Sequence, residues 1–260
     1  MVSSAAGRRV DLSDSAPHSL VTPSNSSGNG IRVGVIDSGW DRTIDDPRVI
    51  AGVGAMRARR GGALDWSTDD RDRNGHGTAA VDLILQVARG ASIVPIRVFG
   101  ARLETSPEVL VGAIDWAVHQ RLPLVNLSAG TLREDALIPL YQACERARRA
   151  GTIVVAAADN RGDGWSFPAV FESAIGVGHA EVPRRHDIIY RPDEALECGA
   201  CAIEQVARGL GGAPSVLSGT SYAAPIVTGH IARFLEDGIA ADLDEIRRQL
   251  LASVRRPIKG

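Results

Sequence analysis

Three residues of this sequence have types, order and surroundings that suit nucleophilic acyl transfer. Asp37 lies in "VIDSG", His76 in "NGHGT" and Ser221 in "SGTSYAAP". A serine nucleophile needs a base that accepts its proton, an acid that orients the base, and hydrogen-bond donors for the developing oxyanion. Asp37, His76 and Ser221 offer one candidate each for the acid, the base and the nucleophile. Each motif alone is weak evidence, because such a motif is more often a turn or a core histidine.

The serine motif predicts a tight turn that opens a helix. Gly219 permits the turn, and Ala223 and Ala224 permit close packing of the helix. We expect Pro225 in the first turn, where a missing N–H costs little. Ser221 would then lie at a helix N-terminus, whose free N–H groups and partial positive charge favour an oxyanion.

The elements that would position these residues follow a regular alternation. Short apolar runs predict buried strands within residues 31–39, 91–99, 122–130, 151–160 and 173–180. Helical periodicity predicts helices at about 76–88, 106–120, 135–150, 220–236 and 241–253. This alternation predicts an α/β fold: a single-domain, three-layer structure with a mainly parallel central sheet and helices on both faces.

In such a sheet, ligand sites form at the carboxyl ends of the strands. The polar or small residues at the predicted strand ends are Asp37, the segment Ser128-Ala129-Gly130, and Asn160. We therefore expect these residues to lie close together.

The three motifs, in this order, resemble the signature motifs of the subtilisin-like serine proteases, the subtilases. The resemblance covers about residues 31–236 and includes "VNLSAG", "VVAAADN" and "SFPAVFESAIGVG" between the motifs. It implies that Asp37 orients His76, that His76 is the general base and then the general acid, and that Ser221 is the nucleophile. It also matches Asn160 to the asparagine that helps to form the oxyanion hole. The resemblance implies no cofactor.

The sequence departs from the family pattern at two kinds of position. The segment after "NGHGT" is short, which argues against the calcium-binding loop of many secreted members, so no metal site is expected. The acidic stretch 67–75 is expected to be a solvated loop. Asp159 and Ala129 replace residues that are usually glycine and a larger apolar residue beside the pocket for the substrate side chain. We expect Ser128, Ala129, Gly130 and Asp159 to bind substrate, and Asp159 to favour a basic side chain or to turn away and leave an apolar pocket.

Composition limits the other possibilities. The chain has 260 residues, 44% of them hydrophobic, and a formal net charge of −2, so no basic surface for nucleic acid is expected. No run is long enough for a membrane span. We expect residues 1–30 to be a flexible arm and residues 31–256 to be the catalytic domain. With no signal peptide visible, a cytoplasmic location is expected. The oligomeric state is left open.

The cysteines are Cys144, Cys198 and Cys201. Their odd number is typical of reduced cysteines in a reducing compartment, although Cys198 and Cys201 are spaced closely enough for a local disulfide. A zinc site would need a second pair of ligands, and none lies nearby in the sequence.

Three functions of different classes follow from these observations. The first is a serine endopeptidase, either intracellular or dedicated to trimming leader peptides, that acts on peptide or protein substrates. The second is a catalytically silent subtilase fold that binds a peptide or a regulatory partner. The third is a dinucleotide-binding domain, suggested by "GVGA" at 52–55, but the full glycine fingerprint is missing.

Overall fold

The computed structural model describes residues 20–58, 64–160 and 165–254. Its centre is a nine-stranded sheet with the strand order β3-β2-β4-β1-β5-β6-β7-β9-β8. The strands are β1 (Arg32–Asp37), β2 (Val53–Arg57), β3 (Leu64–Ser67), β4 (Ser92–Arg97), β5 (Leu124–Leu127), β6 (Ile153–Ala157), β7 (Ile175–His179), β8 (Ile188–Tyr190) and β9 (Cys198–Ala200). The pairing is parallel except at the two edges, where β3 runs antiparallel to β2 and β8 runs antiparallel to β9.

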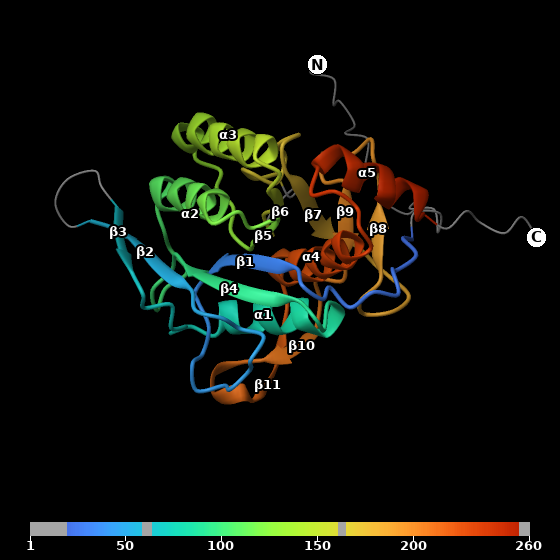
Figure 1. The fold of residues 1–260 in the computed structure, drawn as a ribbon. Helices are drawn as coiled ribbons and strands as arrows, with labels where there is room; N and C mark the ends of the chain where they lie inside the picture. The colour runs from blue at the N-terminus through green and yellow to red at the C-terminus, as the bar shows by residue number, and fades with distance from the viewer. Residues whose placement is uncertain (1–19, 59–63, 161–164, 255–260) are drawn as a thin grey trace, which may run out of the picture.

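Helices cover both faces of this sheet (Figure 1). They are α1 (His76–Val87), α2 (Pro107–His119), α3 (Glu134–Arg149), α4 (Thr220–Glu236) and α5 (Leu243–Ala252). The helices α1, α4 and α5 share one apolar core with the sheet, and α2 and α3 share a second core on the opposite face. The expected three-layer α/β fold is therefore confirmed.

Alternation along the strands explains why both faces are apolar. In β1, Val33 and Val35 belong to the core under α1 and α4, whereas Ile36 belongs to the core under α2 and α3. In β6, Val155 belongs to the core under α1 and α4, and Val154 belongs to the core under α2 and α3. Successive side chains of a strand point to opposite faces, so a strand covered on both faces must be apolar at nearly every position.

The structure also contains strands that the sequence pattern did not predict. These are the edge strands β3 and β8, the strands β2 and β9 beside them, and a separate antiparallel pair of β10 (Gln205–Arg208) and β11 (Pro214–Leu217). Each has only three to five residues. Several of them are partly exposed, so their sequences lack a continuous apolar run.

Of the residues 1–30 expected to form a flexible arm, residues 20–30 make contacts with the folded domain, and residues 1–19 lie outside the described residues. Val21 donates a hydrogen bond to the carbonyl of Ile188, and its side chain is 2% exposed. Further along, Oε2 of Glu236 accepts the backbone N–H groups of Ser27, Gly28 and Asn29 at 2.6, 2.5 and 2.9 Å. We call residues 20–30 the N-terminal segment. The polar sequence of this segment does not predict these contacts, because the acceptor, Glu236, is distant in the sequence, at the end of α4.

Among the residues that the structure describes, no helix has both the length and the apolar character needed to cross a membrane.

Candidate active site

Asp37 is the last residue of β1 and its side chain is fully buried. The backbone continues directly into a tight turn, where Gly39 has a φ of 107°. A Cβ atom at Gly39 would lie 2.2 Å from the carbonyl oxygen of Asp70, so only glycine fits there. The N–H of Ser38 donates to Oδ1 of Asp37 at 2.7 Å, which helps to fix the carboxylate at the end of the strand.

His76 is the first residue of α1, and a buried carboxylate organises the turn before it. Oδ1 of Asp72 accepts the N–H groups of Asn74 and Gly75, and Oδ2 accepts the N–H and the hydroxyl of Thr78. Asp72 is only 8% exposed. These four hydrogen bonds satisfy donors at the helix start and thereby fix where the imidazole leaves the backbone.

The three side chains form a continuous chain of contacts. Nδ1 of His76 lies 2.8 Å from Oδ1 and 3.0 Å from Oδ2 of Asp37. Nε2 of His76 lies 2.9 Å from Oγ of Ser221. A carboxylate can only accept, so Nδ1 carries the proton and Nε2 of the neutral ring is free to accept the serine proton. This is the arrangement that a general base needs.

Two opposing influences act on His76. Burial lowers the pKa of its imidazole, while the charge and the hydrogen bond of Asp37, together with the charge of Asp72, raise the pKa above the ordinary value of 6.5. Above this raised pKa the ring is neutral and can accept a proton, and Asp37 would stabilise a proton on the ring.

Ser221 is the second residue of α4, directly after the turn at Gly219. Gly219 has a φ of 143°, and its N–H donates to the carbonyl of Ala202 at 2.7 Å. The expected turn and helix start are thus confirmed. Pro225 is not in the first turn, however, but is the sixth residue of α4. Its missing N–H therefore leaves the carbonyl of Ser221 without an intrahelical partner.

Asn160 follows β6 and is held by the residue before Ser221. Oδ1 of Asn160 accepts the N–H of Thr220 at 2.7 Å and its hydroxyl at 3.1 Å. A backbone N–H can only donate, so this contact identifies Oδ1 and leaves Nδ2 as the donor end of the amide. The sequence analysis did not single out Thr220, although its position inside "SGTSYAAP" is the signal that could have found it.

A cleft of about 560 Å³ brings the expected site residues together. Its lining includes His76, Ser221, Asn160, Ser128, Ala129, Gly130 and Asp159. Asp37 is buried behind His76 and does not line the cleft. Apolar residues that were not among the expected site residues, namely Phe99, Leu103, Pro107 and Leu110, also line it. They come from the β4–α2 connection and from α2, so only the fold reveals their proximity to Ser221.

The cleft floor is tied to α4 through buried polar contacts. Nδ2 of Asn126 donates to Oγ of Ser128 at 2.8 Å, while Oδ1 of Asn126 accepts the hydroxyl of Thr228 at 3.0 Å. All three side chains are buried, at 7% exposure or less. The end of β5 and the helix that carries Ser221 are therefore held in a fixed relation.

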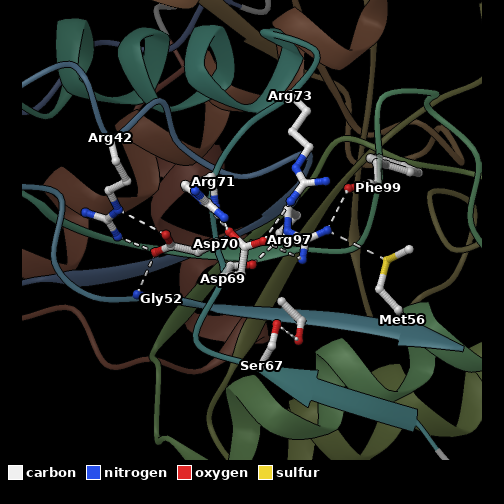
Figure 2. Close-up of polar contacts among 11 residues, drawn as sticks. Arg42, Gly52, Met56, Ser67, Asp69, Asp70, Arg71, Arg73, Arg97 and Phe99 are labelled. Carbon is white, nitrogen blue, oxygen red and sulfur yellow. Dashed lines mark hydrogen bonds and ion pairs between the residues drawn. The ribbon is translucent and has the colours of Figure 1, made fainter. Parts of the chain in front are cut away.

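The acidic loop before His76 has exposed residues, but its carboxylates are paired, which corrects the expectation that they are solvated. Asp70 is 4% exposed and pairs with Arg42 and with the N–H of Gly52 (Figure 2). Asp69 pairs with Arg71 at 2.7 Å and with Arg73 at 2.9 Å, as Figure 2 also shows. Guanidinium groups thus neutralise these carboxylates. The partner of Asp70, Arg42, is distant in the sequence, whereas the partners of Asp69 lie in the same loop.

Within residues 20–58, 64–160 and 165–254, no group of three or more His, Cys, Asp or Glu side chains is arranged to hold a metal ion. Cys144, Cys198 and Cys201 are free thiols, so the alternative of a local disulfide is not realised. The segment "GVGA" forms the start of β2 and does not precede a helix, unlike a dinucleotide fingerprint.

Comparisons with known proteins agree with this geometry. The model of the Subtilase family matches residues 28–255. Subtilisin DY of Bacillus licheniformis is 28% identical over 237 residues, which cover 86% of this chain and 83% of that protein. The major intracellular serine protease of Bacillus subtilis (strain 168) is 29% identical over 261 residues, which cover 90% of this chain and 80% of that protein. Among solved structures, a cold adapted subtilisin-like serine proteinase aligns with a TM-score of 0.66 at 23% identity, over 88% of this chain and 82% of that chain.

Proposed function

Because the chain belongs to the subtilase family of serine proteases, we propose that it is an endopeptidase that hydrolyses peptide bonds through an acyl-enzyme on Ser221. The observation that carries the proposal is the contact of 2.9 Å between Nε2 of His76 and Oγ of Ser221. Its continuation from Nδ1 to Asp37 supplies the orienting acid.

In the acylation step, Oγ of Ser221 attacks the carbonyl carbon of the scissile bond while His76 accepts the hydroxyl proton. The carbonyl π electrons move to the oxygen and form a tetrahedral oxyanion. His76 then gives its proton to the leaving amine as the C–N bond breaks, which leaves an ester on Ser221. Asp37 remains ionised and stabilises the imidazolium during the step.

In the deacylation step, water takes the place of the amine. His76 accepts a proton from the water, whose oxygen attacks the ester carbon, and returns the proton to Oγ of Ser221 as the ester bond breaks. In both steps the backbone N–H of Ser221 and Nδ2 of Asn160 would donate to the oxyanion. The N–H of Ser221 is suited to this role because it is one of the first N–H groups of α4, which have no acceptor within the helix.

The cleft would receive the substrate residue that precedes the scissile bond, between Ser128-Ala129-Gly130 and Asp159. Two carboxylate residues, Asp159 and Glu104, line it, and so does Arg133. The guanidinium of Arg133 is engaged by Asp135. We propose that the carboxylates of Asp159 and Glu104, which border this space, favour a basic substrate side chain at that position.

We expect Asp159→Asn to weaken this basic preference. The ratio of kcat/KM for a lysine peptide to that for a matched methionine peptide should fall about fivefold, because a partly exposed ion pair contributes up to about 1 kcal/mol. The kcat/KM for the methionine peptide should change little, and Asp115→Asn is the matched control, because Asp115 pairs with Arg146 and neither residue lines the cleft. A parent enzyme that prefers the methionine peptide would contradict the proposed specificity.

The cellular role is proposed from the relatives. Two relatives carry "intracellular serine protease" in their names, and they are 29% and 25% identical to this chain. We propose a cytoplasmic peptidase, engaged either in general proteolysis or in trimming leader peptides.

A fluorophosphonate probe tests the proposed function, because it reacts only with a serine that is activated as a nucleophile. We expect covalent labelling of the intact chain at Ser221, found by mass spectrometry of the digested adduct. A folded protein that binds peptides without labelling would instead be the catalytically silent form of the fold. Labelling at a different serine would contradict the assignment of the nucleophile.

A further inference from the structure

A second pocket lies at the ends of α1 and α4 that are remote from His76 and Ser221. It has a volume of about 550 Å³, within the usual range for small-molecule sites. Four segments that are distant in the sequence line it: the N-terminal segment, the end of α1 with the turn after it, residues 184–187 before β8, and the later part of α4. His230 follows Ser221 by nine residues along α4, about 13 Å at 1.5 Å per residue, so the pocket is separate from the cleft.

The lining of this pocket is strongly basic. It contains four arginines, Arg89, Arg184, Arg185 and Arg233, and Asp187 is the single carboxylate among the described lining residues. Asp187 pairs with Arg184 at 3.3 Å. Arg233 and Arg185 donate to the backbone carbonyls of Ser26 and Glu204, and the charges of Glu236 and Asp237 act on Arg233 from the end of α4. The chain as a whole has a net charge of −2, so this concentration of positive charge is a local feature.

Two imidazole groups in the wall have buried nitrogen atoms without a hydrogen-bond partner. These atoms are Nε2 of His186 and Nδ1 of His230, and the residue His230 is only 2% exposed. Nε2 of His230 donates to the carbonyl of His186 at 2.8 Å, so Nδ1 of the neutral ring is an acceptor. Burial lowers the pKa of His230 to about 4 and so keeps the ring neutral; the hydrogen bond to the His186 carbonyl opposes this shift, and the charge of Arg233 adds to it.

The arginines and the two nitrogen atoms without a hydrogen-bond partner indicate which chemical groups a ligand of this pocket must offer. Arginine forks bind phosphate and carboxylate oxygens, so four arginines around one pocket favour an anion. The buried acceptor on His230 needs a donor, whereas His186 can donate from Nε2 when that atom carries its proton. A phosphate group that retains one proton offers oxygen acceptors and one O–H donor, while sulfate at neutral pH offers only acceptors.

We propose that this pocket binds a protonated phosphate group, either as inorganic phosphate or as part of a phosphomonoester. The neighbouring pocket, which shares Arg89 and His186, does not extend the site. Its additional arginines are already paired: Arg48 binds Asp46 at 2.7 Å, and Arg208 binds Asp82 at 2.5 Å. The anion is therefore held on the side of Arg89, Arg185 and Arg233.

Thermal unfolding of the full chain at a pH of about 6, where both inorganic phosphate and a phosphomonoester retain a proton, tests the proposal. The probes are inorganic phosphate and glycerol phosphate, each compared with sulfate and chloride at matched ionic strength. Phosphate at ten times its dissociation constant should raise Tm by about 3–5 °C. The ester should give a comparable rise only if the site accepts a phosphomonoester, and this comparison distinguishes the two sources. Isothermal titration calorimetry should give one site per chain.

Arg89→Gln and Arg185→Gln should each weaken phosphate binding at least tenfold. The matched control is Arg149→Gln on α3, across the sheet from this pocket, which should bind phosphate like the parent. The shift is measured within each variant, so a change in basal stability does not affect the result. Equal shifts with phosphate and chloride, or phosphate binding that persists in both variants, would overturn the proposal. Equal binding of sulfate would overturn the assignment of a protonated phosphate.

Discussion

Replacing Ser221 with alanine is expected to lower the turnover number for peptide hydrolysis by about 10⁶. The reason is that Ser221, His76 and Asp37 act as one unit: without Oγ there is no acyl-enzyme, and His76 has no proton to accept. The residual rate would come only from substrate binding and from the oxyanion donors. Steady-state kinetics on a chromogenic peptide, with active-site titration of the parent enzyme, measure the loss.

The fold should tolerate this change. Among the contacts described above, Oγ of Ser221 takes part only in the one with the imidazole of His76. Circular dichroism and Tm should therefore match those of the parent. Ser218→Ala is the matched control: Ser218 lies in the same motif, is exposed, and accepts the N–H of Glu204 at 3.0 Å. Its turnover should stay within a few-fold of the parent. Near-parent turnover in Ser221→Ala would mean that another residue is the nucleophile.

Replacing Asn160 with alanine should lower the turnover number by about 10²–10³, because one oxyanion donor contributes about 2.7–4 kcal/mol to the transition state. KM should change little, since the amide acts mainly on charge that develops during the reaction. Separate determination of kcat and KM distinguishes this result from a loss of substrate binding.

Asn160→Asp separates the donor role from a structural one. The aspartate keeps an oxygen for the N–H and hydroxyl of Thr220 but has no Nδ2 donor, and it places a negative charge near the oxyanion. We expect a loss at least as large as in Asn160→Ala, with an unchanged Tm. Recovery of parent turnover in Asn160→Asp would show that Asn160 only positions Thr220.

Much of the fold and of the candidate site could be predicted because the relevant signals are local. The strands β1, β5 and β6 are apolar runs, and Asp37 and Asn160 lie at or just after the ends of β1 and β6. Ser221 and His76 lie at helix starts marked by glycine. The alternation of strands and helices then determines that these residues meet at one edge of the sheet.

The features that could not be predicted depend on contacts between distant segments. Asp70 looks solvated in the sequence until Arg42 is placed beside it by the turn after β1. Pro225 was expected at the first turn because it follows the serine motif closely, but the helix begins at Thr220. Edge strands such as β8 are too short for a period to be recognised, and their pairing with β9 is decided by tertiary packing.

The contacts of the N-terminal segment bear on the resistance of the protein to cleavage by other copies of itself. A protease cleaves extended chain whose backbone N–H and C=O groups are free to pair with the cleft, and an unprotected polar segment offers such groups to every other copy in solution. Here the N–H groups of Ser27, Gly28 and Asn29 are already bound to one carboxylate oxygen of Glu236. Cleavage within this stretch must therefore wait for those bonds to open together, so self-digestion there is governed by local unfolding and not by the sequence preference of the cleft.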